Sequence, residues 1–454
     1  MSNARSSVPS RRSRPPTGVL EGVVHRPGDP GYDELRRPLN PSLDPRPAMV
    51  VEASRVSDVR AAVIAARDSR LPVAIQATGH GLQRAYEGGL LVNTSAMSAV
   101  LVDPDRRIAR VGPGATWWQV VAAAAPFGLA PLSGSAPSVG VTGYTLGGGL
   151  SWLSRKHGFA ADSVVRANVV SAQGELISAS ADEHPDLFWA LRGGGGNFGL
   201  VTGLEFRLHP VARVYAGISY FQLERTAEVL TRCRDWVDDA PDELSTAILI
   251  TRLPETAAVP AALRGRRVLA LRLMHIGEPE QAERLLRPLR AAAGPALLEG
   301  LRPAAYRDVA VGETRPRHLD LFRRLPDSVL DFLVDAGRDV GLGISTIEIR
   351  RWGGAMSEPG PDAGPIGHRD ARFSVIADTA EPALAETLRP HATGGSFLNF
   401  LSDPGRAAAA DTRSDYRRLR EVKASYDPDD VFRRGHRIPP LPPTASIGYR
   451  MRAA

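Results

Sequence analysis

The chain has 454 residues, of which 43% are hydrophobic and 23% charged, and its formal net charge is +6. This length predicts two or three domains, and the composition is typical of a soluble globular protein, since no apolar run approaches the length of a membrane span. The positive charge comes from arginines scattered among acidic residues, because Lys156 and Lys423 are the only lysines. No basic stripe is interleaved with aromatic residues, so nucleic-acid binding is not expected.

The N-terminal residues 1–17 combine arginines with serines and prolines. Arg11 and Arg12 form a pair like that of a twin-arginine export signal, but no apolar segment follows them before Gly28. We therefore expect a disordered tail and a cytoplasmic protein. Cys233 is the only cysteine, so no intramolecular disulfide is expected, and its helical surroundings indicate a buried structural thiol.

The first half of the chain alternates predicted helices and strands. A helix over 54–67, which Ser57 or Asp58 could cap, precedes strands at 72–76, 90–93 and 108–111. Thr116 can cap a helix that runs to residue 127 and ends at Gly128. A glycine-rich loop over 135–149 follows, and then a strand at 163–171, a strand at 176–178, a helix at 186–192 and a strand at 200–208. This order predicts an α+β or α/β layer structure.

After Pro210 the pattern changes. Alternating runs at 247–251, 268–273 and 344–350 predict strands of an antiparallel sheet, and arginine- and leucine-rich helices such as 280–289 separate them. A last helix is expected over 416–426. The fold class predicted is α+β, with a second α+β domain built on an antiparallel sheet.

The run from Gly194 to Gly199 matches the letters of a Rossmann dinucleotide fingerprint. In that fold the glycines follow a strand and open a helix. Here a predicted helix precedes them and a predicted strand follows. A structural turn near a cofactor is therefore the better interpretation.

His80 stands between Gly79 and Gly81, directly after an apolar run. A core histidine would not need glycines on both sides, and no second His, Cys or acidic residue lies at metal-ligand spacing. A turn rich in backbone N–H groups can bind phosphate oxygens, and a neutral imidazole can bond to an electrophilic carbon of a cofactor. No metal site is predicted.

Four motifs in order resemble those of the berberine-bridge-enzyme-like flavoproteins, which share the vanillyl-alcohol-oxidase-type (PCMH-type) FAD-binding domain. They are the strand and His80 turn at 72–81, the loop at 137–149, the segment 184–202, and a C-terminal set at 397–403, 416–428 and 432–438. The resemblance implies a PCMH-type FAD-binding domain of two subdomains over 44–211, a substrate-binding domain over 212–394, and a C-terminal segment over 395–440 that returns to the FAD domain.

The resemblance also implies that His80 bonds to the 8α-methyl of FAD. The other residues that it implies for the cofactor are Gln76, Ala77, Thr78, Gly79, Gly81, Leu82, Pro137, Ser138, Val139, Gly140, Gly143, Gly147 and Val201. Many relatives add a second bond from a cysteine just before the Pro-x-Val-Gly motif. Ala136 takes that place here, so a single covalent bond is expected. Val139 matches the position at which relatives with valine are oxidases.

Two departures concern the proton-abstraction step. The family often has Tyr-x-Asn near the flavin, whereas this chain has Phe397-Leu-Asn399, and the closing Asn-His-Asn is reduced to Gly-His436-Arg. The candidate catalytic residues are Tyr144, in the glycine-rich loop, Glu348, on a predicted strand of the substrate domain, and Asn399. A buried Glu348 could act as a base. The alternative is a solvent-facing Glu348 paired with Arg350 or Arg351.

We therefore expect an FAD-linked oxidase that moves a hydride from a C–OH or C–N carbon of a small molecule to flavin N5. O₂ would reoxidise the flavin and give hydrogen peroxide. Relatives oxidise sugars, alkaloids, polyketides and hydroxylated nicotine-like rings, and secondary metabolism is one expected setting. A redox-neutral cyclase or an oxygenase, and a flavin-binding protein without turnover, stay open. No membrane partner is expected, and the sequence leaves the oligomeric state open.

Overall fold

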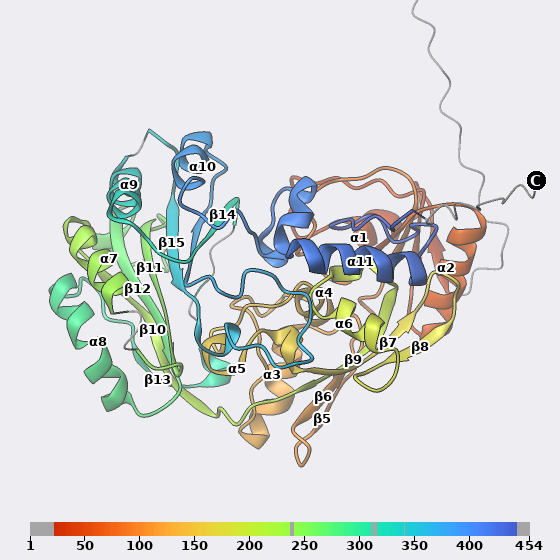
Figure 1. The fold of residues 1–454 in the computed structure, drawn as a ribbon, viewed down its shortest axis with the longest axis horizontal. Helices are drawn as coiled ribbons and strands as arrows, with labels where there is room; N and C mark the ends of the chain where they lie inside the picture. The colour runs from red at the N-terminus through yellow and green to blue at the C-terminus, as the bar shows by residue number, and fades with distance from the viewer. Residues whose placement is uncertain (1–21, 237–239, 310–311, 313–315, 340, 443–454) are drawn as a thin grey trace, which may run out of the picture.

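The computed structural model describes residues 22–236, 240–309, 312, 316–339 and 341–442. The predicted tail at 1–17 lies outside these residues. Within the described chain the strands form three sheets, arranged with their helices as an α+β protein (Figure 1). The predicted fold class is confirmed. No helix among the described residues has the length and apolar character needed to cross a bilayer.

The first sheet carries the strand that leads to His80. Its order is β1 (Val23–His25), β2 (Met49–Glu52), β4 (Leu90–Asn93) and β3 (Val73–Gln76), with β4 parallel to both β2 and β3. Helix α1 (Tyr32–Arg36) and helix α2 (Val56–Asp68) connect its strands. The Asp58 carboxylate caps α2 by accepting bonds from the amides of Ser54 and Arg55 at 3.0 and 3.2 Å. Of the two capping residues predicted, Asp58 is the one used.

The second sheet is antiparallel, with the order β5 (Val100–Asp103), β6 (Ile108–Val111), β9 (Leu200–Arg207), β7 (Val164–Val170) and β8 (Leu176–Ala179). Helices α3 (Trp117–Ala124), α4 (Val141–Leu146) and α6 (Pro185–Leu191) share one apolar core with it, and α5 (Ser154–His157) follows α4 in the chain. The predicted loop over 135–149 is partly wrong, because Val141, Thr142, Thr145 and Leu146 are buried and form one side of α4. The turn at 195–197 follows α6 and precedes β9, as expected.

The third sheet has the order β13 (Arg302–Ala305), β10 (Arg213–Phe221), β12 (Arg267–His275), β11 (Leu244–Arg252), β15 (Thr346–Arg351), β16 (Phe373–Ala377) and β14 (His318–Phe322), all antiparallel. Apolar residues of four helices pack on one face of it, and Figure 1 shows these helices on the outer side of the molecule. They are α7 (Thr226–Asp235), α8 (Pro279–Ala293), α9 (Asp327–Arg338) and α10 (Pro382–Leu388). Cys233 lies on α7 and is buried, as the sequence predicts.

The other face of the third sheet, the inner face, lies against segments from the first half of the chain and from its C-terminal part. Leu132, Trp152 and Leu153 share a core there with Leu249 of β11 and Met274 of β12. A neighbouring core joins Phe159 and Phe397 to residues of β14 and β16. The segments on either side of the glycine-rich loop therefore pack against the sheet of the predicted substrate-binding domain.

Candidate active site

His80 ends up in an exposed turn at the carboxyl end of the parallel strand β3. Gly79 holds a left-handed φ of +68°, and a Cβ there would lie 2.7 Å from Cα of Pro38. Only the backbone amide of His80 is engaged, donating to Oγ1 of Thr78 at 3.4 Å. The imidazole forms no hydrogen bond or ion pair to any residue that the structure describes. It is therefore available to a bound group.

Polar side chains fix the strand ends beneath this turn. Gln76 Nε2 and Asn93 Nδ2 both donate to the carbonyl of Leu35, at 3.2 and 2.8 Å. Gln76 is 8% exposed and Asn93 4%, and both are bonded to backbone, so their amides set the geometry of the turn. The predicted cofactor role of Gln76 would be exercised through its backbone, because its side-chain donor is already used.

The glycine-rich segment meets the His80 turn in space. A Cβ on Gly140 would lie 3.6 Å from Oγ1 of Thr78 and 3.8 Å from Cβ of Ala77. The Val139 carbonyl accepts from the amide of Trp117 at 3.0 Å, which ties this segment to the start of α3. Two motifs separated by about sixty residues in sequence therefore form one surface.

Asn399 fastens the far end of the same loop. Its Oδ1 accepts from the amide of Gly149 at 2.8 Å, and its Nδ2 donates to the carbonyl of Tyr144 at 3.1 Å. Gly148, at φ +108°, passes so close to the Phe397 ring that a Cβ would lie 2.9 Å from it. Asn399 thus acts by positioning the loop, and Phe397 packs where a tyrosine would have offered a hydroxyl.

This surface fits the dinucleotide and ring system of FAD. A Cβ on Gly81 or Gly143 would meet nothing within 4 Å, so open space lies over both glycines. The hydroxyls of Thr142 and Thr145 are buried in α4 without a hydrogen-bond partner among the described residues. Backbone exposed at glycines beside unsatisfied hydroxyls is suited to a large group with phosphate and carbonyl oxygens. For the other residues predicted to bind the cofactor, the structure shows no contact that identifies a ligand.

The Tyr144 phenol does not lie open to a substrate. Its ring sits between Gly134 and Gly149 and meets the Trp117 ring edge-on at 5.3 Å. The hydroxyl is buried and forms no hydrogen bond within the described chain. Burial raises the pKa of Tyr144 well above its ordinary value, so at neutral pH it stays a phenol and cannot accept a proton.

Glu348 lies on the inner face of the third sheet and has no exposed surface. Arg272 Nη1 donates to one of its oxygens at 2.9 Å, and Arg350 Nε donates to the other at 2.7 Å. The alternative of a solvent-facing Glu348 is therefore wrong, although its pairing with Arg350 is right. Two guanidinium groups stabilise the ionised form and occupy both oxygens. This arrangement suits Glu348 to holding the arginines in place better than to taking a proton.

Residues that no sequence motif marks link Glu348 to the glycine-rich segment. The Arg350 guanidinium lies 4.4 Å from the Trp152 ring centroid, and Trp152 Nε1 donates to Oγ of Ser135 at 2.8 Å. Tyr306 joins the same region, since its hydroxyl lies 2.8 Å from Oγ of Ser133. These contacts join positions up to about two hundred residues apart, and no local pattern in the sequence marks them.

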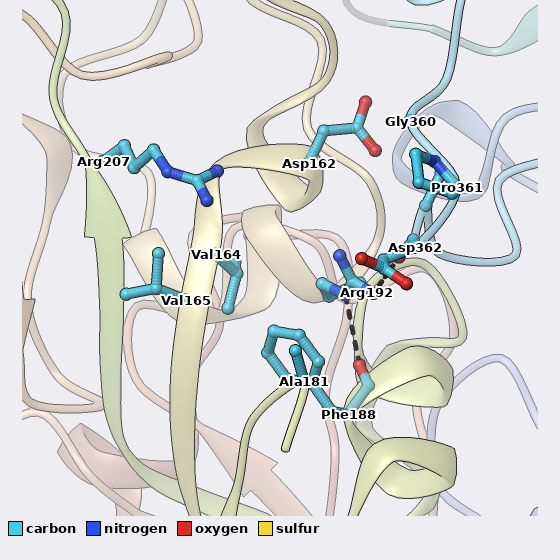
Figure 2. A pocket seen from close by; sticks show the side chains of 11 residues that line it. Asp162, Val164, Val165, Ala181, Phe188, Arg192, Arg207, Gly360, Pro361 and Asp362 are labelled. Carbon is cyan, nitrogen blue, oxygen red and sulfur yellow. Dashed lines mark hydrogen bonds between the residues drawn. The ribbon is translucent and has the colours of Figure 1, made fainter. Parts of the chain in front are cut away.

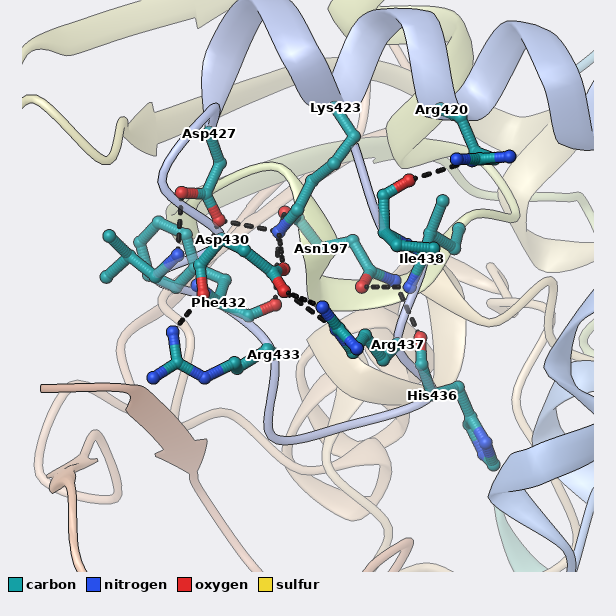
Figure 3. A network of polar contacts seen from close by, with 12 residues as sticks. Asn197, Arg420, Lys423, Asp427, Asp430, Phe432, Arg433, His436, Arg437 and Ile438 are labelled. Atoms are coloured by element: carbon teal, nitrogen blue, oxygen red, sulfur yellow. Dashed lines mark hydrogen bonds and ion pairs between the residues drawn. The ribbon is translucent and has the colours of Figure 1, made fainter. Parts of the chain in front are cut away.

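The C-terminal segment is held to the FAD-binding part by a buried lysine (Figure 3). Helix α11 (Arg413–Tyr426) carries Lys423, whose Nζ donates to Asp427 at 2.5 Å and to the carbonyl of Asn197 at 2.8 Å. Asn197 in turn accepts from the amide of Ile438 at 3.0 Å. The glycine turn after α6 is therefore a structural anchor for the end of the chain, and not a Rossmann loop.

Comparison with known proteins agrees with this geometry. Residues 47–180 match the family model described as "FAD binding domain", and residues 413–439 match "Berberine and berberine like". The (R)-6-hydroxynicotine oxidase of Paenarthrobacter nicotinovorans is 28% identical over 93% of this chain and 97% of its own. A FAD-dependent monooxygenase of Fusarium proliferatum is 35% identical over 44% of this chain and 39% of its own.

A solved structure extends the likeness to the whole fold. The 6-hydroxy-D-nicotine oxidase from Arthrobacter nicotinovorans superimposes with a TM-score of 0.80 and 26% identity, covering 93% of this chain and 99% of that one. The chain belongs to the berberine-bridge-enzyme-like FAD-linked oxidoreductases, with a PCMH-type FAD-binding domain and FAD as its cofactor.

Proposed function

We propose that this enzyme is an oxidase whose FAD is held by one covalent bond, through His80. The observation that carries the proposal is the exposed imidazole of His80, which has no side-chain partner among the described residues. It lies beside Gly81, over which there is open space, as there is over Gly143 of the glycine-rich segment. Ala136 takes the place at which many relatives carry a second flavin-bonded cysteine, and its methyl side chain has no nucleophilic atom, so we propose no second bond there. Formation of the bond removes one hydrogen from the imidazole and one from the flavin methyl, with O₂ as the final electron acceptor.

When bound, FAD would supply a two-electron acceptor for a hydride from the substrate carbon. That hydride, a proton from the substrate OH or NH, and O₂ would together give hydrogen peroxide. The protein's part is to place the substrate and to exclude other reactions. The inner face of the third sheet, with Arg350 stacked on Trp152, would cover the substrate against the flavin. Glu348 holds Arg350 in place by accepting a hydrogen bond from its Nε.

Tyr144 enters this proposal as a neutral group that shapes the loop. Because its hydroxyl is buried and protonated at neutral pH, it cannot supply the base. Asn399 holds Gly149 and the carbonyl of Tyr144 in place through two hydrogen bonds to their backbone. Neither of these bonds reaches a reacting atom. We therefore propose positioning roles for both residues.

The substrate proposed is a small molecule that is oxidised at a C–OH or C–N carbon. The support is the similarity to an (R)-6-hydroxynicotine oxidase over nearly the full length of both chains. Val139 supports reaction with O₂, because a small branched side chain beside the flavin leaves more room than a bulky one. The carbonyl of Val139 is held by Trp117, which fixes the place of that side chain.

Photoreduction followed by exposure to air tests the oxidase proposal. The reduced enzyme should recover its oxidised flavin spectrum within seconds to minutes and release one hydrogen peroxide per flavin. Replacement of Val139 by the bulkier leucine should slow this recovery while leaving photoreduction unchanged. A wild-type flavin that stays reduced for hours in air would contradict the proposal and would favour a flavin-binding protein without turnover.

An oxygenase is the second candidate, because the chain is 35% identical to a FAD-dependent monooxygenase over 44% of its length. Phe397 also stands where relatives carry a tyrosine, which leaves the proton transfer of a simple oxidase without that phenol. Product analysis under ¹⁸O₂ separates the two. An oxidase leaves the label in hydrogen peroxide, and a monooxygenase places one labelled oxygen in the product. A product that forms equally well without O₂ would indicate a redox-neutral cyclisation.

A further inference from the structure

A pocket lies away from the proposed cofactor surface, at the end of the second sheet (Figure 2). Its volume is about 270 Å³. The start of β7, the end of β9, α6 and the loop 360–363 surround it. Its lining includes Asp162, Val164, Phe188, Arg192, Arg207 and Asp362.

Arg192 is the feature that distinguishes this pocket. Only 7% of the residue is exposed, and its guanidinium lies 4.2 Å from the Phe188 ring centroid. Nε donates to the carbonyl of Phe188 at 3.4 Å, and Nη2 donates to the carbonyl of Asp362. Nη1 has no hydrogen-bond partner in the part of the chain that the structure describes. Arg192 forms no ion pair with a described carboxylate, which is uncommon for so buried a charge.

The charged groups at the pocket sum to one positive charge, because Arg192, Arg207 and Arg369 face the carboxylates of Asp162 and Asp362. Asp162 is already engaged, because Arg369 donates to both of its oxygens at 3.0 and 2.7 Å. Arg207 enters from the side of the pocket opposite to Arg192, as Figure 2 shows. Burial lowers the pKa of Arg192, the nearby carboxylates of Asp162 and Asp362 raise it, and the charges of Arg207 and Arg369 lower it. A carboxylate bonded to Nη1 would give this buried charge a direct partner of opposite sign.

The walls indicate what kind of anion fits. Val164 and Phe188 are buried apolar residues, and Val165 and Pro361 add further apolar surface. Guanidinium groups recognise planar carboxylates with paired hydrogen bonds. About 270 Å³ is room for roughly nine water-sized groups. That is enough for a carboxylate on a small apolar body, such as an aromatic ring.

We propose that this pocket is a binding site for a small organic carboxylate, which Arg192 and Arg207 hold from opposite sides. The site is separate from the proposed flavin reaction, since none of its lining residues belongs to the His80 turn or the glycine-rich segment. The carboxylate would take the free Nη1 of Arg192, and its apolar body would lie along Val164 and Phe188.

The test uses the flavin-loaded enzyme with benzoate as the probe and benzamide, its neutral isostere, as the control ligand. Calorimetry should show benzoate binding that weakens as salt is raised, with benzamide binding at least ten-fold more weakly. Arg207→Gln should reduce the benzoate affinity about three- to ten-fold. Arg213→Gln, at an exposed arginine on β10 away from the pocket, should leave the affinity unchanged.

Two outcomes would overturn the proposal. One is an absence of benzoate binding at millimolar concentration, which would leave Arg192 as a clamp for the loop at 360–363. The other is binding that Arg207→Gln does not change and that shifts the flavin spectrum, because the benzoate would then lie at the flavin. Arg192→Lys keeps the charge and loses the planar fork, so it should weaken binding further. If that variant fails to fold, Arg207→Gln still decides.

Discussion

The buried Lys423 makes a quantitative prediction about how the C-terminal segment is held. Lys423 is fully buried and donates to Asp427 at 2.5 Å and to the carbonyls of Asn197 and Phe432 at 2.8 and 3.3 Å. It also lies 3.2 Å from a carboxylate oxygen of Asp430. Lys423→Met keeps most of the side-chain volume and removes the charge.

The variant would leave the Asp427 carboxylate buried without its counter-ion. Removing one partner of a buried ion pair costs about 3–5 kcal/mol, because the remaining charge stays desolvated. Asp427 keeps bonds from the amides of Val431 and Phe432 at 2.8 and 2.9 Å, and Asp430 keeps Arg437 at 2.6 Å. These contacts place the expected loss near the lower end, at about 3 kcal/mol.

Lys156→Met is a matched control, because it makes the same substitution at the only other lysine of the chain. Lys156 pairs with Glu243 at 2.6 Å, but its side chain is 43% exposed. An exposed pair contributes at most about 1 kcal/mol. Urea unfolding followed by fluorescence should therefore show a large drop in midpoint for Lys423→Met and a small one for Lys156→Met. Equal drops would refute the reasoning from burial.

Three further variants test the loop, the sheet face and a titrating group. Gly148→Ala should destabilise the protein by roughly 2 kcal/mol or more in urea, because φ is +108° and the new Cβ would lie 2.9 Å from the Phe397 ring; a neutral result would contradict the tight packing. Glu348→Gln should lower the affinity for substrate more than it lowers kcat, because we assign Glu348 to positioning. The shape of the pH–rate profile should stay unchanged. Loss of an ascending limb in that profile would show that Glu348 is the base. Burial raises the pKa of Asp411 to about 8, above its value of about 4 in an unfolded chain, so stability should fall as pH rises between those values. Asp411→Asn should remove that fall in urea midpoints, and an unchanged pH slope would count against the raised pKa of this carboxyl.

Local patterns predicted the elements that meet at the cofactor surface. The strand at 72–76, the helix at 54–67 and the strand at 200–208 were found within a residue or two, because apolar spacing and caps mark their limits. The sequence does not predict helix α4, because Gly140 and Gly147 flank it, Gly143 lies within it, and glycine favours a loop. Packing of Val141 and Leu146 into the core of the second sheet outweighs that preference.

Contacts between distant segments were beyond the reach of the sequence. Glu348 could be placed on a strand, but its partner Arg272 lies 76 residues away on a strand that is not its neighbour in the sheet. The same holds for Asn399, whose bonds to the glycine-rich segment span about 250 residues. Side-chain roles that depend on such contacts, including the burial of the Tyr144 phenol, needed the fold itself.

The central claim is that FAD is bound through a single covalent bond to His80. Acid precipitation of the purified enzyme, followed by proteolysis and mass spectrometry of the pellet, tests it most directly. We expect a yellow, fluorescent precipitate and one flavin-bearing peptide, which contains His80 and not Ala136. His80→Ala should release the flavin into the supernatant. Flavin that leaves the wild-type protein on precipitation, or a flavin attached to another residue, would contradict the account.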